Sequence, residues 1–182
     1  MFGIEPKLDL HLMVPGQGLN QIVSRALVGL DEIIDAEKPD VIIAQGDTST
    51  AMAAALAGFH RGVKIVHLEA GLRTGDIDSP FPEEANRKII SQVAKLHLAP
   101  TEGSMENLRR ENVRSKDIAV TGNTVIDALL EAASWNTEFE DPALQEATAS
   151  DKRLVVVTTH RRENLEAMKE IGGEVKDLSL IH

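Results

Sequence analysis

The stretch HLEAGLRTGDIDSPFPEEANR, from His67 to Arg87, carries five acidic side chains and two arginines between a short apolar run and a helical pattern. Carboxylates in a cleft can exchange protons with a substrate, and guanidinium groups can orient those carboxylates or bind anions. A solvated loop is the competing interpretation, because clusters of Gly, Pro and Asp usually form turns. The choice between them depends on where the fold places this stretch.

A second polar cluster, THRREN, follows the apolar run LVVV near the end of the sequence. It combines the imidazole of His160 with two guanidinium groups beside a predicted helix start. A diphosphate prefers this combination, because it is bound by positive charge and by the N-terminal amides of helices. His160 alone could equally be an ordinary histidine at the end of a strand.

Composition restricts the possible partners. The chain has 182 residues, of which 42% are hydrophobic, enough for one domain and part of a second. Its formal charge of −10 and its 3% of aromatic residues argue against nucleic acid and against an anionic membrane surface. No apolar run has the length of a membrane span, and no export signal is visible. The absence of Cys fits a reducing compartment, so we expect a cytoplasmic protein.

Common cofactor motifs are missing from the sequence. It contains no HExxH motif, no DxDxDG loop and no histidine pair at ligand spacing, so we expect no dedicated metal site. A Walker phosphate loop and a GxGxxG turn are also absent. The usual signatures of ATP and NAD binding therefore do not apply, and we expect no cofactor.

Short apolar segments alternate with amphipathic ones along most of the chain. This alternation predicts an α/β fold with a parallel, doubly wound, Rossmann-like sheet. The predicted strands are 39–45, 64–68, 96–100 and 117–122, and the predicted helices are 17–37, 46–62, 82–95, 101–112 and 123–135. Residues 1–135 would form this domain, residues 136–152 a polar linker, and residues 153–182 the start of a second α/β domain that opens with a strand and a helix. We expect the helix not to continue into GGEVKDLSLIH.

The polar clusters follow the predicted strands, so all of them should lie at one edge of the sheet, where ligands bind in open parallel sheets. Structural roles remain open for each of them. Asp47, next to Thr48, could cap a helix. Glu69 could form an ion pair with Arg73, four residues later. Glu83 could be favoured by the helix dipole in a first turn.

Six motifs in one order resemble the non-hydrolysing bacterial UDP-N-acetylglucosamine 2-epimerases. They are GDTST, HLEAGLRTGD, SPFPEEANR, APTE, TGNTVIDALL and THRREN. The resemblance implies a GT-B type fold, in which two Rossmann-like domains face each other across a cleft and the second holds most of the UDP. It also implies a fragment that lacks the first strand and helix of the first domain and most of the second domain.

The resemblance implies reversible conversion of UDP-N-acetylglucosamine to UDP-N-acetylmannosamine by elimination and re-addition of UDP, for cell-envelope polysaccharide synthesis. Carried over by motif, the catalytic candidates are Asp47, Glu69 and Glu83 as acids and bases, with His160 stabilising the leaving diphosphate. Arg73 and Arg87 would orient these carboxylates or substrate hydroxyls. Further substrate-binding candidates are Arg161, Glu163 and, for a second activating UDP-N-acetylglucosamine, Gln17 and Gln21.

Two other functions share part of this pattern. A GT-B glycosyltransferase would bind the same nucleotide sugar but transfer the sugar to an acceptor. A non-catalytic nucleotide-sugar-binding module would keep the binding residues and lose the acids. The complete EAGLRTGD and PFPEEANR motifs favour the epimerase. We expect a homodimer at full length, and no activity from the 182-residue chain alone.

Overall fold

The computed structural model describes residues 2–135, 139–151, 153–157 and 168–179. The chain divides into two compact units, residues 1–132 and 133–182, which are described separately below. The domain boundaries that the sequence predicts at residues 135 and 152 stay predictions. None of the described helices is long and apolar enough to cross a bilayer.

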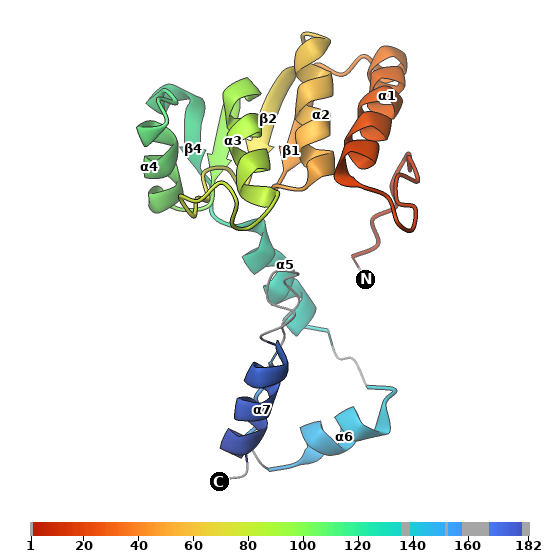
Figure 1. Ribbon diagram of the computed structural model, residues 1–182, viewed down its shortest axis with the longest axis vertical. Coiled ribbons are helices and arrows are strands. Elements are labelled where there is room, and N and C mark those ends of the chain that lie inside the picture. Colours follow the sequence, from red (N-terminus) through yellow and green to blue (C-terminus); the bar gives the residue numbers. More distant parts are fainter. Residues whose placement is uncertain (1, 136–138, 152, 158–167, 180–182) are drawn as a thin grey trace. The chain divides into compact units, whose positions relative to one another are not determined.

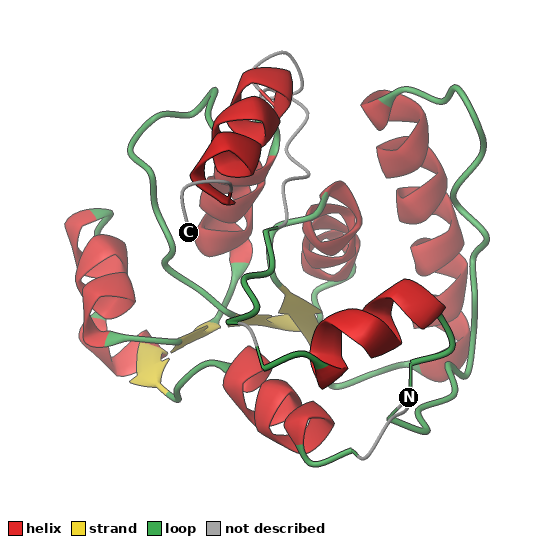
Figure 2. Cartoon of the chain, turned by 90° about the horizontal axis from the view of Figure 1, so that it is seen from below, coloured by secondary structure: helices red, strands yellow, loops and turns green. Residues whose placement is uncertain are grey.

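The first unit contains a parallel sheet of four strands in the order β1-β2-β3-β4. Figures 1 and 2 show the strands of this sheet beside the helices that flank it. Ala44, His67 and His97 lie side by side in the register of the first three strands. The α/β class and the parallel sheet that the sequence predicts are therefore confirmed. The strands are β1 (Val41–Gln45), β2 (Lys64–Leu68), β3 (Leu96–Ala99) and β4 (Ile118–Val120), and the helices are α1 (Leu19–Glu37), α2 (Ser49–His60), α3 (Glu83–Val93), α4 (Glu102–Arg110), a 3-10 turn (Ser115–Asp117) and α5 (Thr124–Ala133).

The core of this unit lies between one face of the sheet and helices α1 to α4. Side chains alternate between the two faces of a strand, so Ala44 and Ile65 point to the same side. They pack there against α2 and α3 through Met52, Ala55 and Ile90. A second cluster joins α4 to β3 and β4, and consists of Ala70, Ala99, Leu108 and Ile118.

The opposite face and the edge of β1 are more open. Ile43 points to that face and is 64% exposed. β1 is an edge strand of the sheet, as its place in the strand order shows. An exposed apolar edge strand can pair with other chains, so this edge is an aggregation risk.

The loops after the strands continue the hydrogen-bonding pattern of the sheet. The amide of Gly46 donates to the carbonyl of Leu68 (3.0 Å), and the amide of Ala70 donates to the carbonyl of Leu98 (3.0 Å). The segments after β1 and β2 are thus fixed side by side at the carboxyl edge. This is the edge at which the sequence predicts the polar clusters.

Gly71 allows the loop after β2 to lie directly against α4. Its φ angle is +90°, and a Cβ atom at this position would lie 2.2 Å from the carbonyl oxygen of Ser104. No other residue fits without moving the backbone of α4. The close contact fixes the loop that carries Glu69 and Arg73.

The second unit differs from the sequence prediction in three respects. The predicted linker contains α6 (Pro142–Ala149), because Asp141 accepts hydrogen bonds from the amides of Ala143 and Leu144 and Pro142 suits the first turn. Residues 153–157 form no strand, since no neighbouring strand is present among the described residues of this unit, and Val155 and Val156 are 73% and 81% exposed. Helix α7 (Met168–Ser179) runs through Gly172 and Gly173. Each glycine destabilises a helix by about 1 kcal/mol relative to Ala, which does not prevent the helix from forming.

Candidate functional site

Asp47 lies two residues beyond the end of β1, where its carboxylate is held by Arg87 of α3. The Nε and Nη2 atoms of Arg87 both donate to Asp47 Oδ2, at 2.9 and 2.7 Å. The N-cap of α2 is instead Thr48, whose hydroxyl accepts from the amide of Ala51 (3.1 Å). The capping role that was open for Asp47 therefore belongs to its neighbour, and the Asp47 carboxylate is left for the site.

The same arginine binds a second carboxylate, that of Glu84, which the sequence motifs do not indicate as a site residue. Arg87 Nη1 donates to Glu84 Oε2 at 2.9 Å, and the Glu84 side chain is fully buried. Glu84 also accepts from the amides of Thr74 (3.3 Å) and Gly75 (3.4 Å) in the loop after β2. We call Asp47, Arg87 and Glu84 the Arg87 network.

Asn86 supports this network from the buried face of α3. Its Nδ2 atom donates to the backbone carbonyl of Asp47 at 2.8 Å. Asn86 is 3% exposed, and Glu84 is also buried. Polar residues on the buried face of a short helix are the sequence signal that could have identified both, because such residues are kept there only when they have partners.

Glu69 is the first residue after β2 and adopts a left-handed conformation with φ of +65°. This conformation is strained for a residue other than Gly, Asn or Asp, and such strain is concentrated at functional sites. It directs the side chain toward the loop after β1. Glu69 Oε2 lies there 3.6 Å from the point at which a Cβ atom would stand if Gly46 carried one. The carboxylate of Glu69 thus lies beside the residue that precedes Asp47.

Arg73 points away from these carboxylates. Its Nε and Nη2 atoms form a bidentate pair with Glu111 at the end of α4, at 2.8 and 2.7 Å. Nη2 also donates to Ser91 of α3 (2.9 Å). The hydrogen bonds from Arg73 lower the pKa of the Glu111 carboxyl. The open possibility that Glu69 pairs with Arg73 is therefore not realised, and the structure does not bring Arg73 to the predicted acids and bases.

Glu83 begins α3 and is half-buried. Among the described residues, it has neither a hydrogen bond nor an ion pair. It is adjacent in sequence to Glu84, whose carboxylate has three partners. Of these two neighbouring glutamates, Glu84 is therefore bound, and Glu83 has no partner among the described residues.

Two histidines are buried beside each other in the sheet below this site. His67 and His97 are register partners on β2 and β3 and are 0% and 1% exposed. His67 Nε2 donates to the carbonyl of Gly46 at 2.8 Å, whereas the Nδ1 atoms of both rings have no partner among the described residues. Burial lowers the pKa of His67, and burial together with the neighbouring His67 lowers the pKa of His97 to about 4.

Acid is expected to destabilise the first unit through these histidines. Between pH 6.5 and about 4 the unfolded chain binds a proton at His97 that the folded chain does not, so stability falls as the pH falls through this range. The loss should reach about 2–3 kcal/mol near pH 4. Urea unfolding of the 182-residue chain at a series of pH values measures it. His97→Gln should reduce the dependence of the unfolding free energy on pH, and an unchanged dependence in this variant contradicts the assignment.

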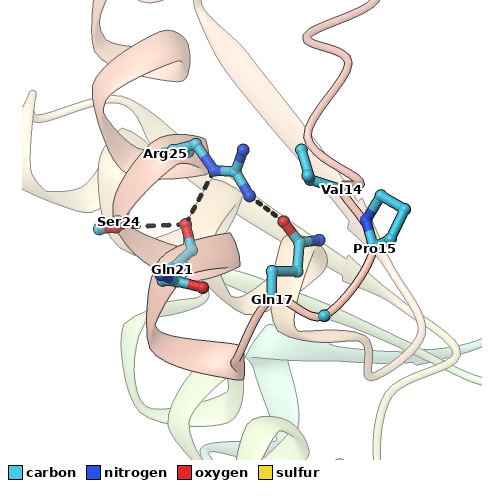
Figure 3. Close-up of a pocket in the computed structure, with 7 residues that line it drawn as sticks. Val14, Pro15, Gln17, Gln21, Ser24 and Arg25 are labelled. Carbon is cyan, nitrogen blue, oxygen red and sulfur yellow. Dashed lines mark hydrogen bonds between the residues drawn. The ribbon is translucent and has the colours of Figure 1, made fainter.

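The sequence candidates Gln17 and Gln21 line a surface pocket of about 490 Å³ at the start of α1 (Figure 3). Both amide oxygens have partners there. Gln21 Oε1 accepts from the amide of Gly18 (3.0 Å) and so caps the helix, while Gln17 Oε1 accepts from Arg25. Arg25 also lines the pocket and carries a charge, although no sequence motif indicates it.

The remaining sequence candidates, His160, Arg161 and Glu163, lie outside the described residues. Within the described part of the chain, no group of three or more His, Asp or Glu side chains could hold a metal ion. The site that the structure describes is therefore built from the loops after β1 and β2 and the first turns of α3.

Known proteins match the chain over nearly its whole length. The family model described as UDP-N-acetylglucosamine 2-epimerase matches residues 1–180. A putative UDP-N-acetylglucosamine 2-epimerase of Thermotoga maritima is 49% identical over 165 residues, which are 91% of this chain and 43% of that protein. The UDP-N-acetylglucosamine 2-epimerase of Escherichia coli K12 is 44% identical over 196 residues, which are 100% of this chain and 50% of that protein.

A solved structure agrees with these sequence relatives. The structure of Staphylococcus aureus MnaA with UDP superposes with a TM-score of 0.88 at 39% identity, covering 98% of this chain and 46% of the other. The chain thus spans about half the length of the curated relatives that it matches. With a family model over almost every residue and relatives above 40% identity, the chain belongs to the UDP-N-acetylglucosamine 2-epimerase family.

Proposed function

We propose that this chain is the part of a UDP-N-acetylglucosamine 2-epimerase that supplies its carboxylates. The reaction interconverts UDP-N-acetylglucosamine and UDP-N-acetylmannosamine. The observation that carries the proposal is the placement of Asp47 and Glu69 in adjacent loops at the ends of β1 and β2. This placement occurs in a chain whose family is named for this reaction.

The proposed reaction has two stages that reverse each other. In the first, a base removes the proton from C2 of the sugar, the C1–O bond to UDP breaks, and a C1=C2 double bond forms. In the second, an acid delivers a proton to C2 from the opposite face while a UDP oxygen adds back to C1. Atoms and charges balance, because the proton and the UDP that leave are replaced by equivalent groups.

Carboxylates suit both proton transfers, each of which contributes about 10²–10⁴-fold to the rate. Asp47 is held by Arg87, Glu69 is directed toward the loop of Asp47 by its backbone conformation, and Glu83 has no other partner among the described residues. We assign proton removal and delivery to this set without dividing the two roles among its members. His160 and Arg161 would stabilise the leaving diphosphate, with Glu163 contacting the nucleotide sugar.

Deuterium incorporation tests this proposal. The protein for the test is a chimera in which the 182 residues replace the matching half of the E. coli relative, and we call it the completed chain. In heavy water the completed chain should convert UDP-N-acetylglucosamine to UDP-N-acetylmannosamine that carries deuterium at C2, because the original proton leaves and a solvent deuteron replaces it. Mass spectrometry of the recovered product measures the label.

The matched control is the E. coli enzyme run in parallel under the same conditions. Product that is free of deuterium at C2 would contradict the elimination mechanism. Transfer of the sugar to an added acceptor would favour a glycosyltransferase. Binding of UDP without any turnover would favour a nucleotide-sugar-binding module.

The wider proposal concerns the setting of this reaction. We propose that the enzyme works in the cytoplasm as a homodimer and supplies cell-envelope polysaccharide synthesis. Its partners would be UDP-N-acetylglucosamine and UDP. Gln17 and Gln21 would contact a second, activating UDP-N-acetylglucosamine, and the pocket of about 490 Å³ at the start of α1 supports this role by its size and polar lining.

A further inference from the structure

We infer that Glu84 is a positioning residue, which fixes Arg87 in the orientation that holds the Asp47 carboxylate at the site. This role rests on the proposed function, since it concerns how one of the proposed acids and bases is held. Among the described residues, Glu84 forms no direct hydrogen bond or ion pair with Asp47 or with the rest of the loop after β1. Its influence on Asp47 passes through the guanidinium of Arg87.

The geometry divides the donors of one arginine between two carboxylates. The Nε and Nη2 atoms of Arg87 face Asp47, and Nη1 faces Glu84 at 2.9 Å. Because the guanidinium group is planar and rigid, fixing Nη1 also fixes the direction of the other two donors. Without Glu84, the side chain of Arg87 could rotate about its torsions and keep only a single contact with Asp47.

Burial separates Glu84 from proton transfer. Its side chain is fully buried, that of Arg87 is 12% exposed, and that of Asp47 is 28% exposed. The network therefore runs from the interior of the unit to its surface, with the positive charge between two negative ones. The buried Glu84 carboxylate has three donors and is therefore already neutralised and oriented. Of the adjacent residues Glu83 and Glu84, only the half-buried Glu83 can reach a substrate.

Glu84 also joins two loops that come from different strands. Its carboxylate accepts from the amides of Thr74 and Gly75 in the loop after β2, while its partner Arg87 binds the loop after β1 through Asp47. One buried side chain thus fixes the distance between the loops that carry Glu69 and Asp47. This is the arrangement expected of a group that preorganises a site by supporting its functional residues.

A double-mutant cycle in the 182-residue chain tests the link without any substrate. Glu84→Gln and Asp47→Asn keep the side-chain shapes, and each leaves Arg87 with one charged partner. Together they leave a nearly buried guanidinium without a carboxylate, which is costly. Each single variant raises the unfolding equilibrium constant by some factor. The double variant should raise it by about tenfold more than the product of these two factors. Urea unfolding measures it.

Two further cycles distinguish positioning through Arg87 from a general loss of stability. The coupling should vanish when Arg87 is replaced by Met, because the connecting group is gone. Glu83→Gln combined with Asp47→Asn should be additive. Additive effects of Glu84→Gln and Asp47→Asn, or a coupling that persists in the Arg87→Met background, would overturn the inference.

The kcat of the completed chain provides a second measurement, which a change of stability alone would not alter. Glu84→Gln should lower kcat by about 10–100-fold with KM changed less than about threefold, because a displaced group affects the chemical step. Ile34→Ala, in a buried position of α1 remote from the site, should lose stability and keep its kcat. An unchanged kcat in Glu84→Gln would contradict the positioning role. Loss of all turnover in the unsubstituted completed chain would count against the proposed function, and the cycles would still decide the link to Arg87.

Discussion

Replacing Asp47, Glu69 or Glu83 by its amide is expected to lower kcat of the completed chain by about 10²–10⁴-fold. An amide keeps the shape of the side chain but can neither accept a proton from carbon nor deliver one. The affinity for UDP should change little, since the resemblance implies that the second domain holds most of the nucleotide. Steady-state kinetics and calorimetry measure the two quantities separately.

Two controls make this result specific. Glu106→Gln changes an exposed acid of α4 that lies outside the six motifs, and it should leave kcat unchanged. Asp47→Asn also weakens the contact with Arg87, so its kcat is compared with its fraction of folded protein. Near-normal turnover in any of the three amides would return that residue to a structural role.

The elements that carry the site follow from local sequence. Pro39 ends the pattern of α1, the Ala-rich segment after Asp47 forms α2, and the four apolar runs predicted as strands of the first unit become the strands of the sheet. Since parallel strands end at one edge, the polar residues after them are brought together by topology alone. The placement of Asp47 and Glu69 could therefore be predicted without knowledge of any contact.

The partners of these residues could not be predicted in the same way. Arg73 lies four residues after Glu69, a spacing that suggests an ion pair, yet it binds Glu111, which is 38 positions away in the sequence. Glu84 and Glu83 are identical in type and adjacent, and only the packing of α3 decides which is buried. Tertiary contacts choose among equivalent side chains, and sequence spacing within a segment does not contain that information.

The 182-residue chain alone is expected to show no measurable epimerisation and only weak binding of UDP. The site lies on the open edge of a sheet, and the Asp47 carboxylate is 28% exposed. Electrostatic stabilisation and proton transfer to carbon both require a site from which water is excluded. The relatives are about twice as long as this chain, so in them more protein is available to enclose the site.

The comparison of the chain with the completed chain, in one assay and at equal concentration of folded protein, measures this effect directly. The completed chain should form UDP-N-acetylmannosamine, and the 182-residue chain should not. Size-exclusion chromatography before the assay removes aggregates that the open edge of β1 favours. Turnover by a purified, monomeric 182-residue chain would show that the described loops and the Arg87 network enclose enough of the substrate by themselves. In that case the catalytic site would be complete within half of the length of its relatives, and the role proposed for a facing domain would be limited to nucleotide affinity.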